Sequence, residues 1–175
     1  MAGSLIKIDE EIVSSAVASV ELGGANWDSS YDVYMFTANN VVCSESIRDG
    51  RLRVTKSGTA DTTANYDSAA KNLKSYGAFG NYSQTNSTYW NRVIANFQVT
   101  TSGVSGNAII YLYNFNSSSE YSFVTLDDAT MYSSGLLGQQ GGGVHTVASA
   151  SDGIQFFFSS GNITSGTFTL YGLKK

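Results

Sequence analysis

Short segments in which β-branched or aromatic residues alternate with polar ones recur along the whole chain. They are spaced at about eight to twelve residues, which is typical of β-sandwiches and β-barrels. Clusters of Gly, Asn, Ser and Asp lie between them and are expected to form the turns, because the chain contains no proline. The pattern predicts an all-β fold and argues against a parallel α/β sheet, which would need helices between its strands.

One of the clearest strands is predicted over residues 31–37. Its alternation places Tyr34 and Phe36 on one face and Met35 and Thr37 on the other. Other strong strand segments are expected at residues 109–115, 121–126, 144–148, 154–159 and 167–172.

We expect these strands to form an antiparallel β-sandwich of jelly-roll type, with the strong C-terminal strands in its centre. No linker, composition break or repeat of fixed period divides the chain, so residues 1–175 are expected to form a single domain. Within it, residues 1–22 are expected to be an N-terminal extended strand segment.

Charge restricts the partners that such a domain can bind. The chain carries a formal net charge of −4, with 14% charged residues and a pI of about 4.8. Binding to nucleic acid needs clustered Lys and Arg, and only Arg48, Arg51, Arg53 and Lys56 come close to a cluster. We therefore expect no binding to nucleic acid. We expect these four on the solvent-facing side of an exposed strand. A surface rich in Ser, Thr, Asn and Gly instead suits neutral ligands or packing against other subunits.

The sequence shows no targeting or membrane segment. It has no run of about 18 apolar residues, so no membrane insertion is predicted. Residues 1–8 lack a basic segment followed by a long apolar stretch, so no signal peptide is predicted and synthesis in the cytoplasm is expected.

Residues suited to nucleophilic catalysis are few. His145 is the only histidine and Cys43 the only cysteine. His145 lies in a strand-like segment, where a position on a polar face is expected, and Cys43 follows two valines, where a small buried side chain is expected. No nucleophile motif supports pairing either residue with a catalytic partner.

Carboxylate and glycine patterns do not indicate a catalytic, metal or cofactor site either. Asp127 and Asp128, like Glu10 and Glu11, are adjacent, and neighbours on a strand point to opposite faces, so neither pair can form a glycosidase dyad. A pair of carboxylates distant in sequence remains open. The glycine-rich segment 135–143 lacks the features of a phosphate loop, and we expect a flexible surface loop there. We predict no enzyme activity and no cofactor.

Aromatic side chains are the best candidates for ligand contact. Trp27, Tyr89 and Trp90 lie at turn-like or strand-entry positions, where flat rings could stack on a sugar or contact another subunit. The alternative is that such rings cap the hydrophobic core. Candidate binding loops are residues 23–30, 59–84 and 135–143, because binding residues gather on loops over a rigid scaffold.

Several long segments resemble a family of small virion structural proteins of tailed phages, marine cyanophages in particular. The resemblance covers nearly the whole chain except residues 41–90, and its motifs are distinctive in combination but carry no chemistry. They are Ser4–Asp9, Gly24–Met35, Tyr111–Phe123, Gly141–Val144 and Ile154–Lys175.

The resemblance implies a β-sandwich module of a fibre, an appendage or a head decoration, without catalytic residues. It implies a virion location after assembly in the host cytoplasm, and a homotrimer in contact with other virion proteins and with a host-surface glycan or outer-membrane protein. We expect an appendage module for host attachment. The alternatives are a head decoration that stabilises the capsid and a tail protein that depolymerises glycans.

Overall fold

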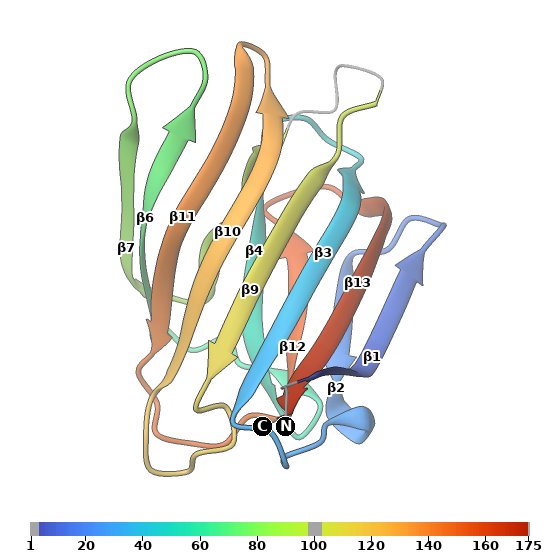
Figure 1. Cartoon of the computed structure of the whole chain (residues 1–175), viewed down its shortest axis with the longest axis vertical. Coiled ribbons are helices and arrows are strands. Elements are labelled where there is room, and N and C mark those ends of the chain that lie inside the picture. The colour runs from blue at the N-terminus through green and yellow to red at the C-terminus, as the bar shows by residue number, and fades with distance from the viewer. Residues whose placement is uncertain (1–3, 98–102, 175) are drawn as a thin grey trace.

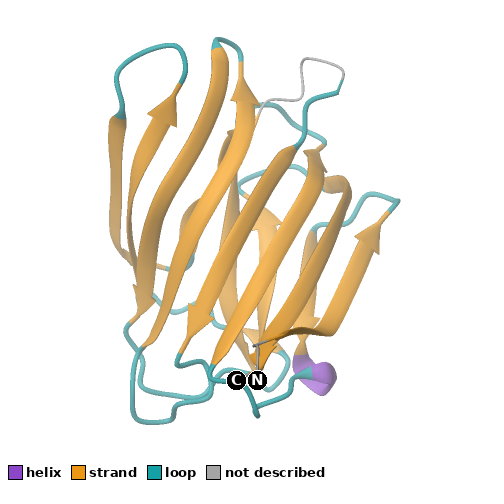
Figure 2. Cartoon of the chain, viewed as in Figure 1, coloured by secondary structure: helices purple, strands orange, loops and turns teal. Residues whose placement is uncertain are grey.

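A computed structural model describes residues 4–97 and 103–174 and shows two antiparallel β-sheets packed face to face (Figures 1 and 2). The larger sheet has eight strands in the order β1 (Ser4–Val13), β13 (Ile163–Lys174), β3 (Val33–Cys43), β9 (Gly106–Tyr113), β10 (Ser122–Tyr132), β11 (Gly135–His145), β6 (Tyr66–Lys74) and β7 (Gly80–Ser87). The smaller sheet has the order β2 (Ser19–Gly23), β12 (Gly153–Phe158), β4 (Arg48–Lys56) and β5 (Thr59–Ala60), with β8 (Trp90–Phe97) also paired to β4. A 3-10 turn, η1 (Gly24–Asn26), follows β2. The predicted all-β sandwich is confirmed.

Alternation along the strands builds the core between the two sheets. On β3, Tyr34 and Phe36 point inward and are fully buried, as their spacing predicted. The Phe36 ring stacks on Phe168 of β13 with centroids 6.3 Å apart, and Phe156 of β12 lies 5.2 Å from Phe168. Rings from both sheets therefore meet at the centre of the sandwich, where each buried aromatic side chain stabilises the fold by about 2–3 kcal/mol.

The C-terminal strands take different places from those expected. Strand β12 is flanked on both sides in the smaller sheet, by β2 and β4. Strand β13 lies next to the edge strand β1 in the larger sheet, so it is not central there. The described part of the predicted segment 1–22 contains β1 and most of β2, which belong to different sheets.

The glycine-rich segment 135–143 is a strand, β11, and the predicted loop is wrong. It pairs with β10 on one side and β6 on the other. A Cβ atom on Gly143 would lie 2.5 Å from the Trp90 ring, and one on Gly141 would lie 2.4 Å from the backbone oxygen of Ala69. Close packing on the strand, and not a turn, explains these glycines.

Strands β10, β11, β6 and β7 continue the larger sheet past β2 and β12 of the smaller sheet, and we call these four strands the extension. In Figure 1, β10, β11, β6 and β7 form one side of the larger sheet, while β12 and β2 lie behind its other side. Strand β8 of the smaller sheet packs against the inner face of β10 and β11. The outer face of this extension is open to solvent and carries the main candidate site.

Candidate functional site

Trp27 is half-buried and tied to the loops at one end of the sandwich. Its ring stacks on Tyr34 with centroids 4.1 Å apart, and its Nε1 atom donates a hydrogen bond of 2.9 Å to Oδ1 of Asn116. Asn116 in turn donates through Nδ2 to the backbone oxygen of Tyr31 (2.7 Å) and to the Tyr34 hydroxyl (2.7 Å). The indole N–H of Trp27 and one side of its ring therefore contact other parts of the fold, which leaves little of the side chain to contact a ligand.

Trp90 is completely buried, so its expected role as a surface contact is wrong. Its Nε1 atom donates to the backbone oxygen of Val144 (3.2 Å), and its ring makes an edge contact with Tyr66 at 5.1 Å between centroids. The alternative, that such rings complete the core, holds for this residue. Its place at the start of β8, directly beneath the bare backbone of Gly143, could not be read from local sequence.

Tyr89 is half-buried and lies on the outer face of the smaller sheet. The guanidinium carbon of Arg51 is 4.1 Å from the centroid of its ring, and the Phe157 ring meets it edge-on at 6.0 Å. Tyr89 is thus the expected contact residue that lies within a cluster of basic and aromatic side chains.

His145 is on the inner face of β11 and is fully buried, so the expected polar-face position is wrong. Its Nε2 atom lies 3.3 Å from Oδ2 of Asp61, which also pairs with Lys56 at 2.9 Å. Burial lowers the pKa of His145, and the positive charge of Lys56 lowers it further. Burial opposes ionisation of Asp61, but hydrogen bonds from Thr63 and Lys56 outweigh it and hold the pKa of Asp61 well below its ordinary value. The imidazole of His145 is enclosed and cannot reach a substrate in this conformation, whereas Asp61 and Lys56 are partly exposed.

Cys43 is buried in the core, as expected, and lies apart from His145. Its thiol contacts the backbone oxygen of Ser160 at 3.6 Å, and burial raises its pKa. The packing partners of His145 are instead Tyr66 and Trp90. The structure does not bring the two residues together.

Asp127 and Asp128 point to opposite faces of β10, as predicted. Asp127 is exposed on the outer face, whereas Asp128 is buried and its Oδ2 accepts a hydrogen bond of 2.8 Å from the backbone N–H of Ala95. Burial raises the pKa of Asp128 to about 7, although backbone hydrogen bonds from Ala95 and Gln139 partly oppose this. Oδ1 of Asp128 has no hydrogen-bond partner among the described residues. Asp128 faces β8 inside the sandwich and is not available to a ligand on the outer face.

An open groove of about 520 Å³ crosses the extension of the larger sheet on its outer face. Its floor is a row of small residues on four neighbouring strands, which strand register places side by side. They are Thr125, Gly142, Ala69 and Ser83. We call this feature the glycine groove.

One wall of the glycine groove is apolar. Two positions before Thr125 on β10, Phe123 is 45% exposed and lies opposite Val144 of β11. An aromatic ring that stands beside a floor of small residues offers a flat stacking surface.

Beyond the residues that line the glycine groove, the outer face of the same four strands is polar, and we call this region the polar border. Two positions beyond the floor row on each strand, and on the same face, four long polar side chains form a second row. Gln140 donates through Nε2 to Asp127 (3.0 Å), and Lys71 donates through Nζ to Asn81 (3.0 Å). All four are exposed, so further donor and acceptor positions remain open to solvent.

This combination of groups suits a neutral polyhydroxylated ligand. Phe123 can pack against the C–H face of a sugar ring, while the amide and charged side chains of the polar row can bond its hydroxyl groups. The floor residues leave room because Gly142 has no side chain and Ala69 and Ser83 have short ones. The sequence missed this site because its floor residues are up to 73 positions apart (Ala69 to Gly142), and only strand pairing brings them together.

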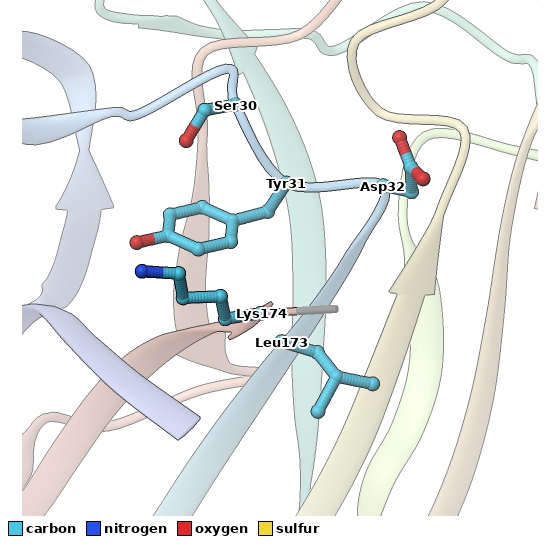
Figure 3. Close-up of a pocket in the computed structure, with 5 residues that line it drawn as sticks. All are labelled: Ser30, Tyr31, Asp32, Leu173 and Lys174. Carbon is cyan, nitrogen blue, oxygen red and sulfur yellow. The ribbon is translucent and has the colours of Figure 1, made fainter. Parts of the chain in front are cut away.

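A second hollow, of about 390 Å³, lies at one end of the sandwich (Figure 3). It is lined by Tyr31 and Asp32 from the loop before β3 and by Leu173 and Lys174 from the end of β13, with Lys174 extending beside the Tyr31 ring. Its one acidic and one basic side chain show no preference for the charge of a ligand, so we give it no functional role.

Of the segments expected to be binding loops, one is a loop and another is mostly strand. Residues 24–30 do form a loop with η1, whereas the segment 59–84 consists largely of β5, β6 and β7. The contact surface of β6 and β7 is therefore the face of a sheet and not a loop.

Across residues 4–97 and 103–174, no group of three or more His, Cys, Asp or Glu side chains is placed to hold a metal ion. Nor does this part of the chain contain a helix long and apolar enough to cross a membrane. Comparison of the sequence and structure with protein-family models, with curated proteins and with solved structures finds no match.

Proposed function

We propose that the chain is a non-enzymatic structural component of a tailed-phage virion, a fibre or appendage module that attaches to a glycan on the host surface through the glycine groove. The virion assignment rests on the resemblance of the sequence segments described above. The attachment role rests on one observation, the open groove with its small-residue floor and exposed Phe123, next to the polar border.

The fold of the groove supports recognition without turnover. The carboxylate that lines the groove is that of Asp67, whose Oδ1 accepts a hydrogen bond of 2.7 Å from the backbone N–H of Asn86, whereas Asp127 lies beyond the lining and Asp128 is buried on the other face. A glycosidase needs two carboxylates that face the same bond. The alternative of a glycan-depolymerising tail protein predicts new reducing ends during incubation with host polysaccharide, whereas the attachment role predicts none.

A head decoration protein is the second candidate, and the outer face of the larger sheet favours it. Ile109 and Tyr111 of β9 and Met131 of β10 are large apolar side chains exposed on this face. Such side chains can pack on a neighbouring virion protein or on copies of this chain, which we propose to be a homotrimer.

We further propose that the sandwich is a jelly roll with two insertions. Support comes from the strand order, in which β1, β13, β3 and β9 adjoin in one sheet while β2, β12, β4 and β8 adjoin in the other. In both sheets, strands from the two ends of the chain are neighbours. Strands β5–β7 and β10–β11 are then the insertions, and the glycine groove is built on the inserted strands β6, β7, β10 and β11.

Immunogold labelling of intact particles with an antibody to this chain tests the proposal. A few labels at the tail or its appendages are expected. Many labels spread evenly over the head would instead establish the decoration alternative. Particles without label, with the antibody shown to bind the purified chain, would contradict a virion role.

A further inference from the structure

All four arginines of the chain lie on two strands that pair with each other. Arg48, Arg51 and Arg53 are on β4, and Arg92 is on β8. The remaining basic residues are lysines. Leu52 and Val54 of β4 are buried in the core, so Arg51 and Arg53 project from the outer face of the smaller sheet.

These arginines differ in whether a carboxylate neutralises them. Arg48 pairs with Glu45 at 2.8 Å and Arg92 with Asp49 at 3.3 Å. Among the described residues, no carboxylate lies within ion-pair distance of Arg51 or Arg53. Two adjacent positive charges are therefore left without a counter-charge on a protein whose net charge is −4.

Aromatic rings and neutral groups hold both side chains in place. The guanidinium of Arg51 lies over Tyr89 at 4.1 Å, and that of Arg53 lies over Phe157 at 4.3 Å. The Nε atom of Arg51 donates to Asn91 (3.0 Å), and the Nε atom of Arg53 donates to the backbone oxygen of Thr88 (2.9 Å).

The guanidinium ends of the two arginines are therefore fixed in orientation before any ligand arrives. A planar, stacked guanidinium is suited to bidentate bonding of a carboxylate, and fixing it beforehand lowers the entropy lost on binding. Burial lowers the pKa of Arg53, and the charge of Arg51 adds to this effect, so an anion would relieve the repulsion between them.

We propose that Arg51, Arg53, Tyr89 and Phe157 form a binding site for the carboxylate of an acidic sugar residue in a glycan. The guanidinium groups bind the carboxylate, and the exposed parts of Tyr89 and Phe157 contact the sugar ring. The site lies on the opposite side of the sandwich from the glycine groove, and the inference does not depend on the function proposed for that groove.

The size and charge of the site select this ligand class over an extended polyanion. Two unpaired arginines can neutralise one or two anionic groups, whereas nucleic-acid binding uses many phosphate contacts. Gln155 links the site to an acidic side chain at its border. Its Oε1 accepts a hydrogen bond of 3.4 Å from Arg53, and its Nε2 donates one of 2.8 Å to Glu21. A ligand with a single carboxylate on a mostly neutral body fits between these charges.

Titration of the full chain with 3′-sialyllactose, a trisaccharide that carries one carboxylate, followed by NMR or calorimetry at low ionic strength, tests the inference. We expect binding that is lost for its methyl ester, which has the same rings but no charge. Arg51→Gln and Arg53→Gln should each weaken binding at least about tenfold. Arg51→Lys, which keeps the charge but not the planar fork, should fall between Arg51→Gln and the wild type.

Arg48→Gln is the matched control, because it removes the same charge from the same strand at a residue that already has a carboxylate partner. It should change affinity by less than about twofold. Equal losses for Arg48→Gln and Arg51→Gln would show a diffuse charge effect and overturn the site. It would also be overturned by absence of 3′-sialyllactose binding, by equal binding of the methyl ester, or by equally tight binding of a single-stranded DNA oligonucleotide.

Discussion

The indole N–H of Trp27 donates a hydrogen bond of 2.9 Å to the side-chain oxygen of Asn116, which lies 89 positions later in the chain. The Nδ2 atom of Asn116 lies within hydrogen-bond distance of the backbone oxygens of Ser29 and Tyr31 and of the Tyr34 hydroxyl. One amide side chain thus joins the loop before β3 to the loop after β9.

Replacing that amide should destabilise the fold. Asn116→Ala leaves the Trp27 N–H and the backbone oxygen of Tyr31 without partners, at an expected cost of about 2–3 kcal/mol in the free energy of unfolding. Urea denaturation measures this cost. Asn81→Ala, which loses one exposed hydrogen bond to Lys71, is the control and should cost less than about 0.5 kcal/mol. Equal stabilities of the two variants would show that the Asn116 contacts do not hold the loops together.

Gly143 should tolerate no side chain. A Cβ atom there would lie 2.5 Å from the buried Trp90 ring, so Gly143→Ala must displace the ring or the strand, at an expected cost of about 1–3 kcal/mol. Thermal unfolding, together with the near-ultraviolet circular dichroism of the tryptophans, reports both effects. Gly58→Ala makes a useful control for backbone strain, because Gly58 has a positive φ but open space around it. An unchanged melting temperature and spectrum for Gly143→Ala would contradict the packing of Trp90 beneath β11.

Asp128 should make stability fall as pH rises. Its folded-state pKa, about 7, lies above the ordinary value of 3.8, so between these pH values the folded protein retains a proton that the unfolded chain has released. Stability is therefore lost as pH rises from about 4 to 7, by an amount that the pKa difference limits to roughly 4 kcal/mol.

Asp128→Asn removes that ionisation and keeps an oxygen that can accept from the Ala95 N–H. We expect the variant to be more stable than the wild type at pH 8 and close to it at pH 4, as judged by urea denaturation. Asp127→Asn, on the exposed face of the same strand, should show no such gain. A wild type at least as stable as Asp128→Asn at pH 8 would contradict the buried, proton-retaining state of Asp128.

The single histidine allows a direct measurement of the opposite effect. Burial lowers the pKa of His145, so the unfolded chain takes up a proton before the folded protein does and stability is lost as pH falls below about 6.5. In an NMR titration the imidazole Cε1–H resonance should move only below pH 6.5. A midpoint at or above that value would show that His145 is solvated or gains more from Asp61 than the buried geometry indicates.

Local sequence predicted where strands occur and which face each side chain takes better than it predicted which segments pack against one another. Alternation is a property of each strand alone. It predicted that Tyr34 and Phe36 share one face of β3 and that Asp127 and Asp128 lie on opposite faces of β10, and both predictions are confirmed. A loop was predicted at residues 135–143 because glycine favours turns. In the structure these residues form a strand, and the Trp90 ring and the backbone of Ala69 leave no room for a side chain at Gly143 and Gly141. The same long-range packing buries Trp90.

The candidate site could not be predicted from the sequence for a related reason. The floor and polar border of the glycine groove depend on the register between β10, β11, β6 and β7, which no local pattern encodes. The basic cluster on β4 was visible in sequence, and its predicted solvent-facing position is confirmed for Arg51 and Arg53. The separation into paired and unpaired arginines required the structure.

Binding to a glycan microarray that includes bacterial surface polysaccharides tests most directly whether the glycine groove is an attachment site. The wild type should bind at least one neutral glycan without releasing reducing ends. Ala69→Trp, which fills the floor of the groove at an exposed position, should abolish that binding, whereas Ala69→Ser and Arg51→Gln should retain it. Absence of glycan binding by the wild type, or equal binding by the wild type and Ala69→Trp, would contradict the role proposed for the groove.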